Sequence, residues 1–262
     1  MDTLNDIFMY TCFSKTPALS PTGDCRPFSD KADGTLLGEG MAMVALKRLA
    51  DAERDGDRIY AVLQGVGASS DGRAKSVYAP RPEGQAKALQ RAYDAAGYSP
   101  KTVELVEAHG TGTKAGDVAE FGGLELVFKA ADSKERQWCA LGSVKSQIGH
   151  TKAAAGAAGL FKAVMALHHK VLPPTIKIER PNPKLNLEES PFYLNTKTRP
   201  WVRGSDHPRR ASVSSFGFGG SNFHLTLEEY NGDAPKAWKK RVMASELVLL
   251  GAKSGADFEN PF

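Results

Sequence analysis

The chain has 262 residues, of which 41% are hydrophobic and 24% are charged, a composition typical of a globular protein. The formal charge of +4 arises from interspersed acidic and basic residues, so it gives no strong argument for nucleic acid as a partner. No apolar run approaches the roughly 20 residues that a membrane span needs. The N-terminus also lacks the pattern of a secretory signal. We therefore expect neither nucleic-acid nor membrane binding.

The three cysteines are Cys12, Cys25 and Cys139. An odd number without regular spacing argues against a disulfide framework, and no pair has the spacing of zinc ligands. We therefore predict no bound metal and a reducing, cytoplasmic location.

The predicted elements alternate between strands and helices. After a loop at 17–24, the apolar run 41–46 predicts a buried strand and the charged segment 48–55 a helix. A strand at 59–66 precedes an amphipathic helix at 82–97, whose last residue is a glycine suited to the C-cap. Further strands are predicted at 103–108, 139–144, 192–195, 211–216 and 222–229, and further helices at 116–128 and 151–170. This alternation predicts an α/β fold with a buried sheet.

The C-terminal segment differs in composition from the rest. From Asn231 the chain is polar and basic, and within it the run 246–253 predicts one more strand. Both ends of the chain have the character of interior segments, which predicts that they are cuts within a larger polypeptide.

The first motif that carries chemistry is HGTGT at 109–113, directly after the predicted strand 103–108. Active-site residues of open α/β sheets usually lie at such a strand end, which makes His109 a catalytic candidate. The glycines allow a ligand close to the backbone, and the hydroxyls of Thr111 and Thr113 are suited to binding amides. The alternative is a turn with a capping histidine.

The second motif, KSQIGH at 145–150, lies between the predicted strand 139–144 and the predicted helix 151–170. Because a helix N-terminus disfavours positive charge, we expect His150 to stay neutral and to donate a hydrogen bond. Lys145 is placed to hold a nearby charge, and a solvated lysine is the alternative.

The third motif, FGFGGSN at 216–222, places two aromatic residues among three glycines. Backbone amides in such a loop suit an oxyanion hole, and Gly217, Phe218 and Gly219 are the candidates. A phosphate-binding loop is the alternative, but no lysine follows the glycines and the next segment is predicted as a strand.

In this order and at these separations, the three motifs resemble those of the β-ketoacyl synthase family. The resemblance extends from about Phe13 to Tyr230. The runs SKTPALSP, SVYAPRPEGQAKAL and HHKVLPPTIK are similar to the ketosynthase of polyunsaturated fatty acid synthases. Discrete ketosynthases often carry an acid nine residues beyond the second histidine. Here that residue is Gly159, as in many modular enzymes.

The resemblance implies a thiolase-like fold, in which two related halves each form a sheet with helices. On this basis, residues 1–55 would end the N-terminal half and residues 56–230 would form the C-terminal half. Residues 231–262 would begin a linker towards an acyltransferase domain. Family members are homodimers, so the full domain is expected to be one.

The resemblance also implies a reaction, the decarboxylative Claisen condensation of an acyl thioester with malonyl-carrier protein. His109 and His150 would donate hydrogen bonds to the malonyl thioester carbonyl and stabilise the enolate, supported by Lys145. The backbone N–H of Phe218 would form half of the oxyanion hole for the acyl thioester, and its ring would gate the acyl channel.

Substrate delivery in this family implies an acyl carrier protein as partner. Thr111 and Thr113 would bind the amides of its phosphopantetheine arm, and the backbone at Gly217 and Gly219 would also face the substrate. No cofactor is expected to bind directly.

The family's nucleophilic cysteine lies in the first half, upstream of the segment where this chain begins. None of the three cysteines lies in its sequence context, so we expect the chain alone to be inactive without the missing N-terminal half.

Three alternatives to a catalytic ketosynthase are a structural subunit, a thiolase and a docking module. A non-catalytic, chain-length-factor-like structural subunit is disfavoured because His109, His150 and Lys145 are all retained. A thiolase would need a cysteine within 216–221, where none occurs. A module that docks carrier proteins without chemistry is the remaining alternative.

Overall fold

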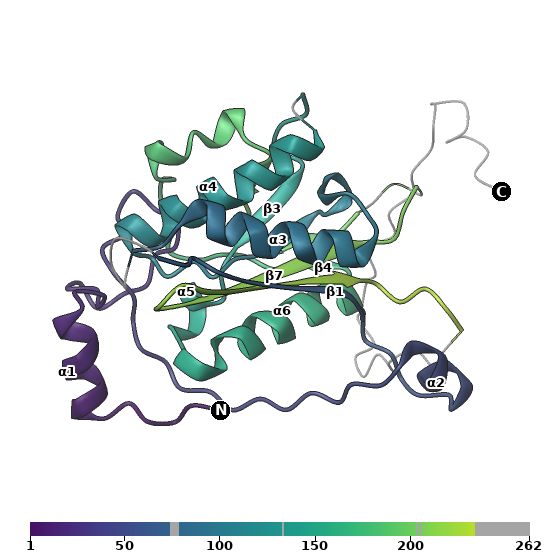
Figure 1. The fold of residues 1–262 in the computed structure, drawn as a ribbon, viewed down its shortest axis with the longest axis horizontal. Helices are drawn as coiled ribbons and strands as arrows, with labels where there is room; N and C mark the ends of the chain where they lie inside the picture. The colour runs from purple at the N-terminus through teal and green to yellow at the C-terminus, as the bar shows by residue number, and fades with distance from the viewer. Residues whose placement is uncertain (74–78, 133, 203, 205, 234–262) are drawn as a thin grey trace, which may run out of the picture.

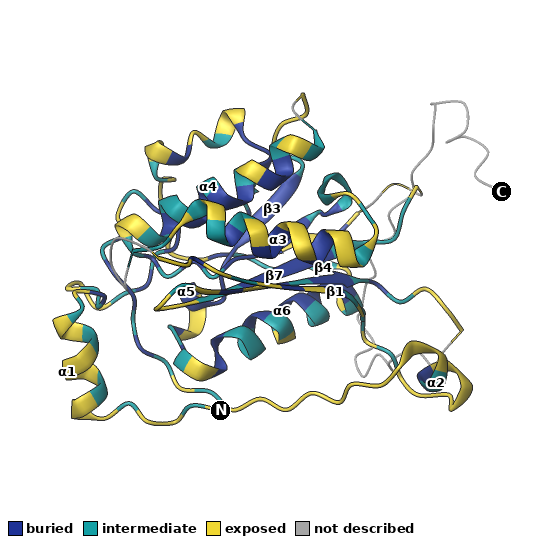
Figure 2. Cartoon of the chain, in the orientation of Figure 1, coloured by how far each residue is buried: buried dark blue, intermediate teal, exposed yellow. Residues whose placement is uncertain are grey.

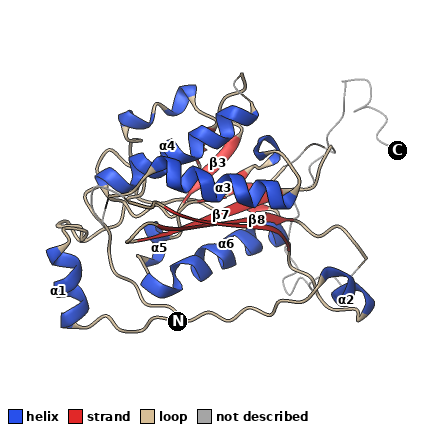
Figure 3. Cartoon of the chain, viewed as in Figure 1, coloured by secondary structure: helices blue, strands red, loops and turns tan. Residues whose placement is uncertain are grey.

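The computed structural model describes residues 1–73, 79–132, 134–202, 204 and 206–233. At its centre lies a six-stranded sheet with the order β1-β8-β7-β2-β3-β5, drawn in red in Figure 3. The pairs β1–β8 and β8–β7 are antiparallel, and the pairs β7–β2, β2–β3 and β3–β5 are parallel. The strands are β1 (Val62–Ser70), β2 (Leu105–Glu107), β3 (Cys139–Gly142), β5 (Phe192–Leu194), β7 (Arg210–Gly217) and β8 (Ser221–Glu228). The α/β fold class is confirmed.

Helices cover both faces of this sheet (Figure 1). Helices α3 (Pro82–Ala96) and α4 (Lys114–Ala131) pack together on one face, and α6 (Ala155–His169) packs on the other. The shorter elements are α1 (Ile7–Lys15), α2 (Leu49–Arg54), α5 (Lys145–Ile148), the paired strands β4 (Val171–Leu172) and β6 (Arg199–Pro200), and 3-10 turns at Pro100–Thr102, Lys152–Ala154, Pro183–Leu185 and Leu187–Glu189. None of the helices in the described ranges combines the length and the apolar character needed to cross a bilayer.

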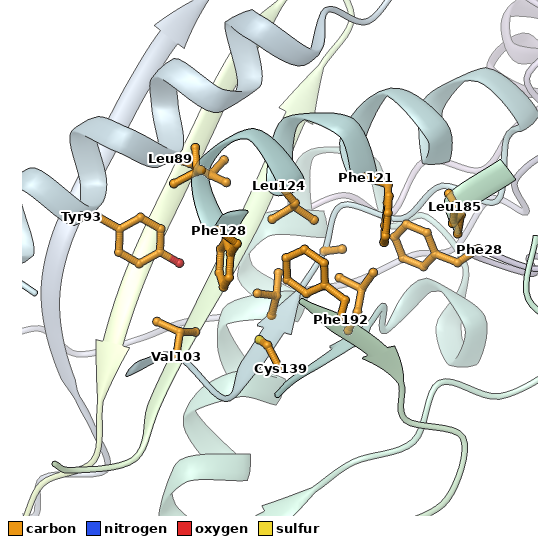
Figure 4. Packing of buried hydrophobic residues seen from close by; sticks show 14 residues of the cluster. Phe28, Leu89, Tyr93, Val103, Phe121, Leu124, Phe128, Cys139, Leu185 and Phe192 are labelled. Carbon is orange, nitrogen blue, oxygen red and sulfur yellow. The ribbon is translucent and has the colours of Figure 1, made fainter. Parts of the chain in front are cut away.

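Two hydrophobic cores hold the layers together. Between the sheet and α3/α4 the core combines aromatic and aliphatic side chains (Figure 4), with the rings of Phe128 and Phe192 4.8 Å apart. Beside α6 the core is built from smaller residues, among them Ala163 and Ala166, together with Trp201. Small side chains let α6 lie close to the sheet, which fixes the distance between α6 and the strand ends.

Several predicted elements agree with the structure. The helix predicted at 82–97 is α3, and Gly97 is its C-cap with a left-handed φ of 71°, a conformation that glycine adopts without strain. The helix predicted at 48–55 is α2. The strand predicted at 59–66 begins later, at Val62, and extends to Ser70.

The buried strand predicted at 41–46 is wrong. This stretch forms no strand, and Figure 2 shows it as an exposed, extended loop that leads to α2. Met43 is 98% and Leu46 75% exposed. Its first residues border a pocket of about 750 Å³ that is also lined by Ile148 and Phe161. An apolar run becomes a strand only where another strand pairs with it, and in the described chain none lies beside this one.

One further boundary differs from prediction. The helix predicted at 151–170 begins only at Ala155, after the 3-10 turn Lys152–Ala154, so His150 does not stand at its N-terminus. Only one face of α6 is buried, and Phe161 is 60% exposed. The strand predicted at 246–253 lies outside the described residues.

Candidate active site

Parallel pairing brings the two histidine motifs together. Strands β2 and β3 pair in parallel, with Glu107 opposite Gly142. The segments that follow the two strands therefore leave the sheet at the same edge. His109 follows β2, and His150 follows β3 and the single turn of α5. The imidazole centroids lie 5.2 Å apart with the rings nearly perpendicular at 83°.

Strand β7 adds an aromatic side chain to this pair. It runs parallel to β2, so Phe216 reaches the same edge, and its ring centroid lies 5.9 Å from that of His109. The glycine-rich turn then leads back into β8. Phe218, within this turn, is 57% exposed, and its ring lies 6.3 Å from Phe13 of α1. The motif therefore borders the histidines through Phe216 and extends to α1 through Phe218.

Buried carboxylates of α4 hold the HGTGT loop. Glu120 accepts hydrogen bonds from the backbone N–H groups of His109 and Gly110, each at 2.7 Å. Asp117 accepts from the N–H of Gly112 at 3.0 Å and from that of Phe28 at 2.7 Å. Burial raises the pKa of each carboxyl to about 7. The loop is thus fixed through its backbone, which leaves the His109 ring to face the site.

The loop threonines are partly committed to this architecture. The Oγ1 of Thr113 caps α4 by accepting from the N–H of Gly116 at 3.2 Å, and it lies 2.9 Å from the Oγ1 of Thr111. Both hydroxyls therefore stand together at the start of α4, beside the backbone of the loop.

Lys145 lies buried against His109. Its Nζ donates to the carbonyl oxygen of His109 at 2.5 Å and stands 3.4 Å from Nδ1 of the same residue. Burial lowers the pKa of Lys145, opposed mainly by the charges of Glu120 and Glu107. The alternative of a solvated lysine is therefore wrong.

The hydrogen bonds define which nitrogen of each imidazole carries the proton. The N–H of Lys152 donates to Nδ1 of His150 at 3.0 Å, so neutral His150 carries its proton on Nε2. Lys145, a donor, faces Nδ1 of His109, which assigns the same tautomer to that ring. Both imidazoles thus offer an Nε2–H donor.

Burial keeps these imidazoles neutral. It lowers the pKa of His150 to about 3, with smaller contributions from the charges of Lys145 and Lys152. Burial likewise lowers the pKa of His109 far below its ordinary value, aided by Lys145 and by His150. A neutral His150 was expected from a helix N-terminus, but burial is the larger cause.

Residues early in the chain cover the second motif. The N–H of His150 donates to the carbonyl oxygen of Leu36 at 2.6 Å, and the N–H of Gly38 donates to the carbonyl oxygen of His150 at 3.0 Å. Lys152 forms an ion pair with Asp2 at 3.0 Å. These contacts over a long sequence separation make the N-terminal segment part of the site.

The cysteines lie in different surroundings. Cys25 is buried, and its Sγ lies 3.3 Å from the carbonyl oxygen of Thr111; burial raises the pKa of its thiol to about 11. Cys139 is enclosed within β3, where burial raises the pKa of its thiol well above the ordinary value. Cys12 is exposed on α1.

Sequence patterns alone missed two residues next to the histidines. One is Phe216 as a contact of His109, and the other is Glu107, whose carboxylate accepts a hydrogen bond from the N–H of Val144 and pairs with Lys162 at 2.8 Å. A signal for Glu107 was present, since it is an acid within a predicted buried strand, two residues before a motif histidine.

Comparison with known proteins decides the family. The model of the β-ketoacyl synthase C-terminal domain matches residues 60–179, that of the ketoacyl-synthetase C-terminal extension residues 181–258, and that of the β-ketoacyl synthase N-terminal domain residues 2–52. The chain belongs to the β-ketoacyl synthase family. The domain boundaries at 55 and 230 stay predictions.

Relatives of this ketosynthase chain are much longer synthases. It is 47% identical over 252 residues to one of the polyunsaturated fatty acid synthase subunits of a Thraustochytrium species, covering 95% of the chain and 9% of the relative. It is 46% identical over 236 residues to polyketide synthase PksN of Bacillus subtilis, covering 86% of the chain and 4% of the relative. The chain is thus a ketosynthase domain segment of the polyketide and polyunsaturated fatty acid synthase type.

Solved structures agree with the predicted fold. The ketosynthase from module 6 of the bacillaene synthase of Bacillus subtilis superposes with a TM-score of 0.85 at 42% identity, covering 88% of this chain and 41% of that one. A Streptomyces albus oxazolomycin ketosynthase domain gives a TM-score of 0.85 at 38% identity, covering 89% of this chain and 42% of that one. The thiolase-like fold is confirmed, and the chain spans less than half of these solved ketosynthases.

Proposed function

We propose that this chain forms the two-histidine site of a β-ketoacyl-carrier-protein synthase, which condenses an acyl thioester with malonyl-carrier protein. The observation that carries this proposal is the pair of half-buried, neutral imidazoles 5.2 Å apart, both with a donor at Nε2. Two fixed neutral donors suit an oxygen that becomes negative during reaction, because they stabilise the charge without giving up a proton.

The reaction follows from these donors. The bond between the malonyl carboxylate and its α-carbon breaks, carbon dioxide leaves, and the electron pair passes to the thioester oxygen held by His109 and His150. The resulting enolate carbon attacks the acyl thioester, a carbon–carbon bond forms, and the acyl group's thiolate leaves. The backbone N–H of Phe218, between Gly217 and Gly219, would stabilise the second oxyanion. Lys145 keeps His109 neutral and in place.

The substrate would arrive on an acyl carrier protein. The hydroxyls of Thr111 and Thr113, 2.9 Å apart beside the loop backbone, are proposed to meet the amides of its phosphopantetheine arm. The product class follows the relatives, which are named polyunsaturated fatty acid and polyketide synthases.

The acyl-bearing nucleophile is proposed to lie outside this chain. Burial raises the pKa of the Cys25 thiol to about 11 and that of the Cys139 thiol well above its ordinary value, which disfavours the thiolate in both. Cys12 is exposed on α1. An N-terminal half that supplies the cysteine is therefore the proposed partner, and the complete domain is proposed to be a homodimer.

A non-catalytic structural subunit is less well supported. Such a subunit needs neither two half-buried imidazoles in matched tautomers nor a buried lysine against one of them, and removing these groups from water is costly.

Release of carbon dioxide from malonyl-carrier protein tests the proposal. In a complete ketosynthase domain that contains this chain, His109→Ala and His150→Ala should each lower the rate by about 100-fold or more, the usual loss for one oxyanion donor. His169→Ala, a substitution on the exposed end of α6, is the matched control and should leave the rate unchanged. Rates within a few-fold of the unmodified domain in both site variants would refute the assigned roles.

A further inference from the structure

An ion pair that the proposed mechanism does not use is buried beside the two histidine loops. Glu107, the last residue of β2, has 1% of its side chain exposed, and Lys162 of α6 has 10%. The distance between Nζ and Oε2 is 2.8 Å. Because both charges must leave water, a buried ion pair adds little to folding stability. A role other than stability is therefore the better explanation for this pair.

The carboxylate of Glu107 joins three elements. It belongs to β2, its Oε1 accepts from the N–H of Val144 in the segment after β3, and its Oε2 pairs with Lys162 of α6. Val144 immediately precedes Lys145, and Glu107 stands two residues before His109. One side chain therefore ties both histidine-bearing segments to the helix that covers this face of the sheet.

Gly159 makes room for this arrangement. A Cβ at Gly159 would lie 3.2 Å from Cγ of Glu107 and 3.1 Å from Cγ1 of Val213, both tighter than ordinary contacts. Lys162 follows Gly159 by three residues and so lies on the same face of α6. Because Gly159 has no side chain, the Glu107 side chain can occupy the space beside it.

We infer that Glu107 and Lys162 are positioning residues, which hold the segment of Lys145 and His150 against His109. This inference rests on the proposed function. Neither residue touches the Nε2 atoms that face substrate, so the pair acts by fixing the separation of the two imidazoles. Its removal should therefore slow turnover more than it weakens substrate binding.

The first test removes the charge and keeps the shape. In the complete ketosynthase domain, Glu107→Gln should lower kcat by about 10-fold with KM within about 2-fold, because a small displacement of catalytic groups acts on the reacting step. Glu125→Gln, which breaks the more exposed ion pair with Lys129 on α4, is the matched control and should change neither value.

The second test moves the carboxylate from the strand to the helix. Glu107→Gly should lose at least as much turnover as Glu107→Gln. Glu107→Gly combined with Gly159→Glu places a carboxylate in the same space and should recover kcat to within about 3-fold of the unmodified domain. Gly159→Glu alone crowds Glu107 and should be destabilising.

The results separate this inference from the proposed function. If the unmodified domain does not condense, the proposed function fails, and nitrogen NMR of the imidazoles in the 262-residue chain then decides the inference. Glu107→Gln should convert the single Nε2–H tautomer of His109 into a mixture, because it loosens Val144 and with it Lys145, whose Nζ faces Nδ1 of His109. Unchanged tautomers, unchanged kcat in Glu107→Gln, or a relocated carboxylate that performs no better than Glu107→Gly would overturn the inference.

Discussion

Loss of hydration strongly lowers the pKa of three histidines of this chain, which keeps their rings neutral. They are His109 and His150 in the site and His224 in β8, where burial lowers the pKa to about 3. Their pKa in an unfolded chain is near 6.5. The unfolded chain therefore takes up protons below pH 6.5 that the folded chain does not. The stability from each neutral histidine is complete above pH 6.5 and is lost as the pH falls towards the folded-state value.

His224 offers a clean measurement of this effect because it lies outside the candidate site. Its Nδ1 is 3.0 Å from Oγ of Ser214 and its Nε2 is 3.4 Å from the hydroxyl of Tyr93. A His224→Gln variant lacks the titrating ring, so between pH 6.5 and about 5 the unmodified chain should lose about 2 kcal/mol more than the variant. Urea unfolding of both chains at the two pH values measures this. The raised pKa values of Asp117 and Glu120 act in the opposite direction and cancel in the difference. An equal loss in both chains would contradict burial of a neutral ring.

At the scale of elements, helix α3 rests directly on the backbone of β1. A Cβ at Gly67 would overlap the carbonyl oxygen of Ala88 in α3, so the absence of a side chain sets this spacing. The same face of α3 contributes Leu89 and Tyr93 to the core between the sheet and α3/α4 (Figure 4). The close approach fixes β1 and its neighbour β8, which follows the glycine-rich turn.

Gly67→Ala should therefore lower the free energy of unfolding by about 3 kcal/mol, the upper part of the range for overpacking. Gly122→Ala in α4 is the matched control. Its Cβ would meet only Pro82, at 3.7 Å, and replacing a helical glycine should raise the free energy of unfolding by about 0.5–1 kcal/mol. Chemical denaturation of the two variants should give opposite signs, and equal effects would show that α3 does not depend on this contact.

The elements differ in how far their local sequence determines them. Helix α3 was predictable because amphipathic spacing and the capping Gly97 are local signals. The conformation of the segment 41–46 was not predictable, because an apolar run carries no information on whether another strand will pair with it. Helix α1 was also missed, since all its residues are at least partly exposed and no buried face marks it.

The candidate site shows the same division. His109, Lys145 and His150 follow from motifs placed after predicted strands. Glu107 and Phe216 could not be placed without the register of β2 with β3 and β7, because their contacts join segments distant in the chain.

At the scale of the whole molecule, the chain spans 41% of a solved ketosynthase. Within this part, one edge of a single sheet gathers both imidazoles, Lys145 and Phe216, and the N-terminal segment at Leu36 and Gly38 holds the second motif in place. The described residues thus contain the proposed enolate-stabilising groups, whereas burial disfavours the thiolate of Cys25 and of Cys139.

The central claim is that this chain supplies the enolate-stabilising groups and that an N-terminal half supplies the nucleophile. Condensation measured with and without an N-terminal ketosynthase half tests this claim most directly. With acyl and malonyl carrier proteins as substrates, the 262-residue chain should form no β-ketoacyl product, and the same chain within a complete domain should form it. Product formation by the chain alone would contradict the account, as would a complete domain that remains inactive while its histidine site is intact.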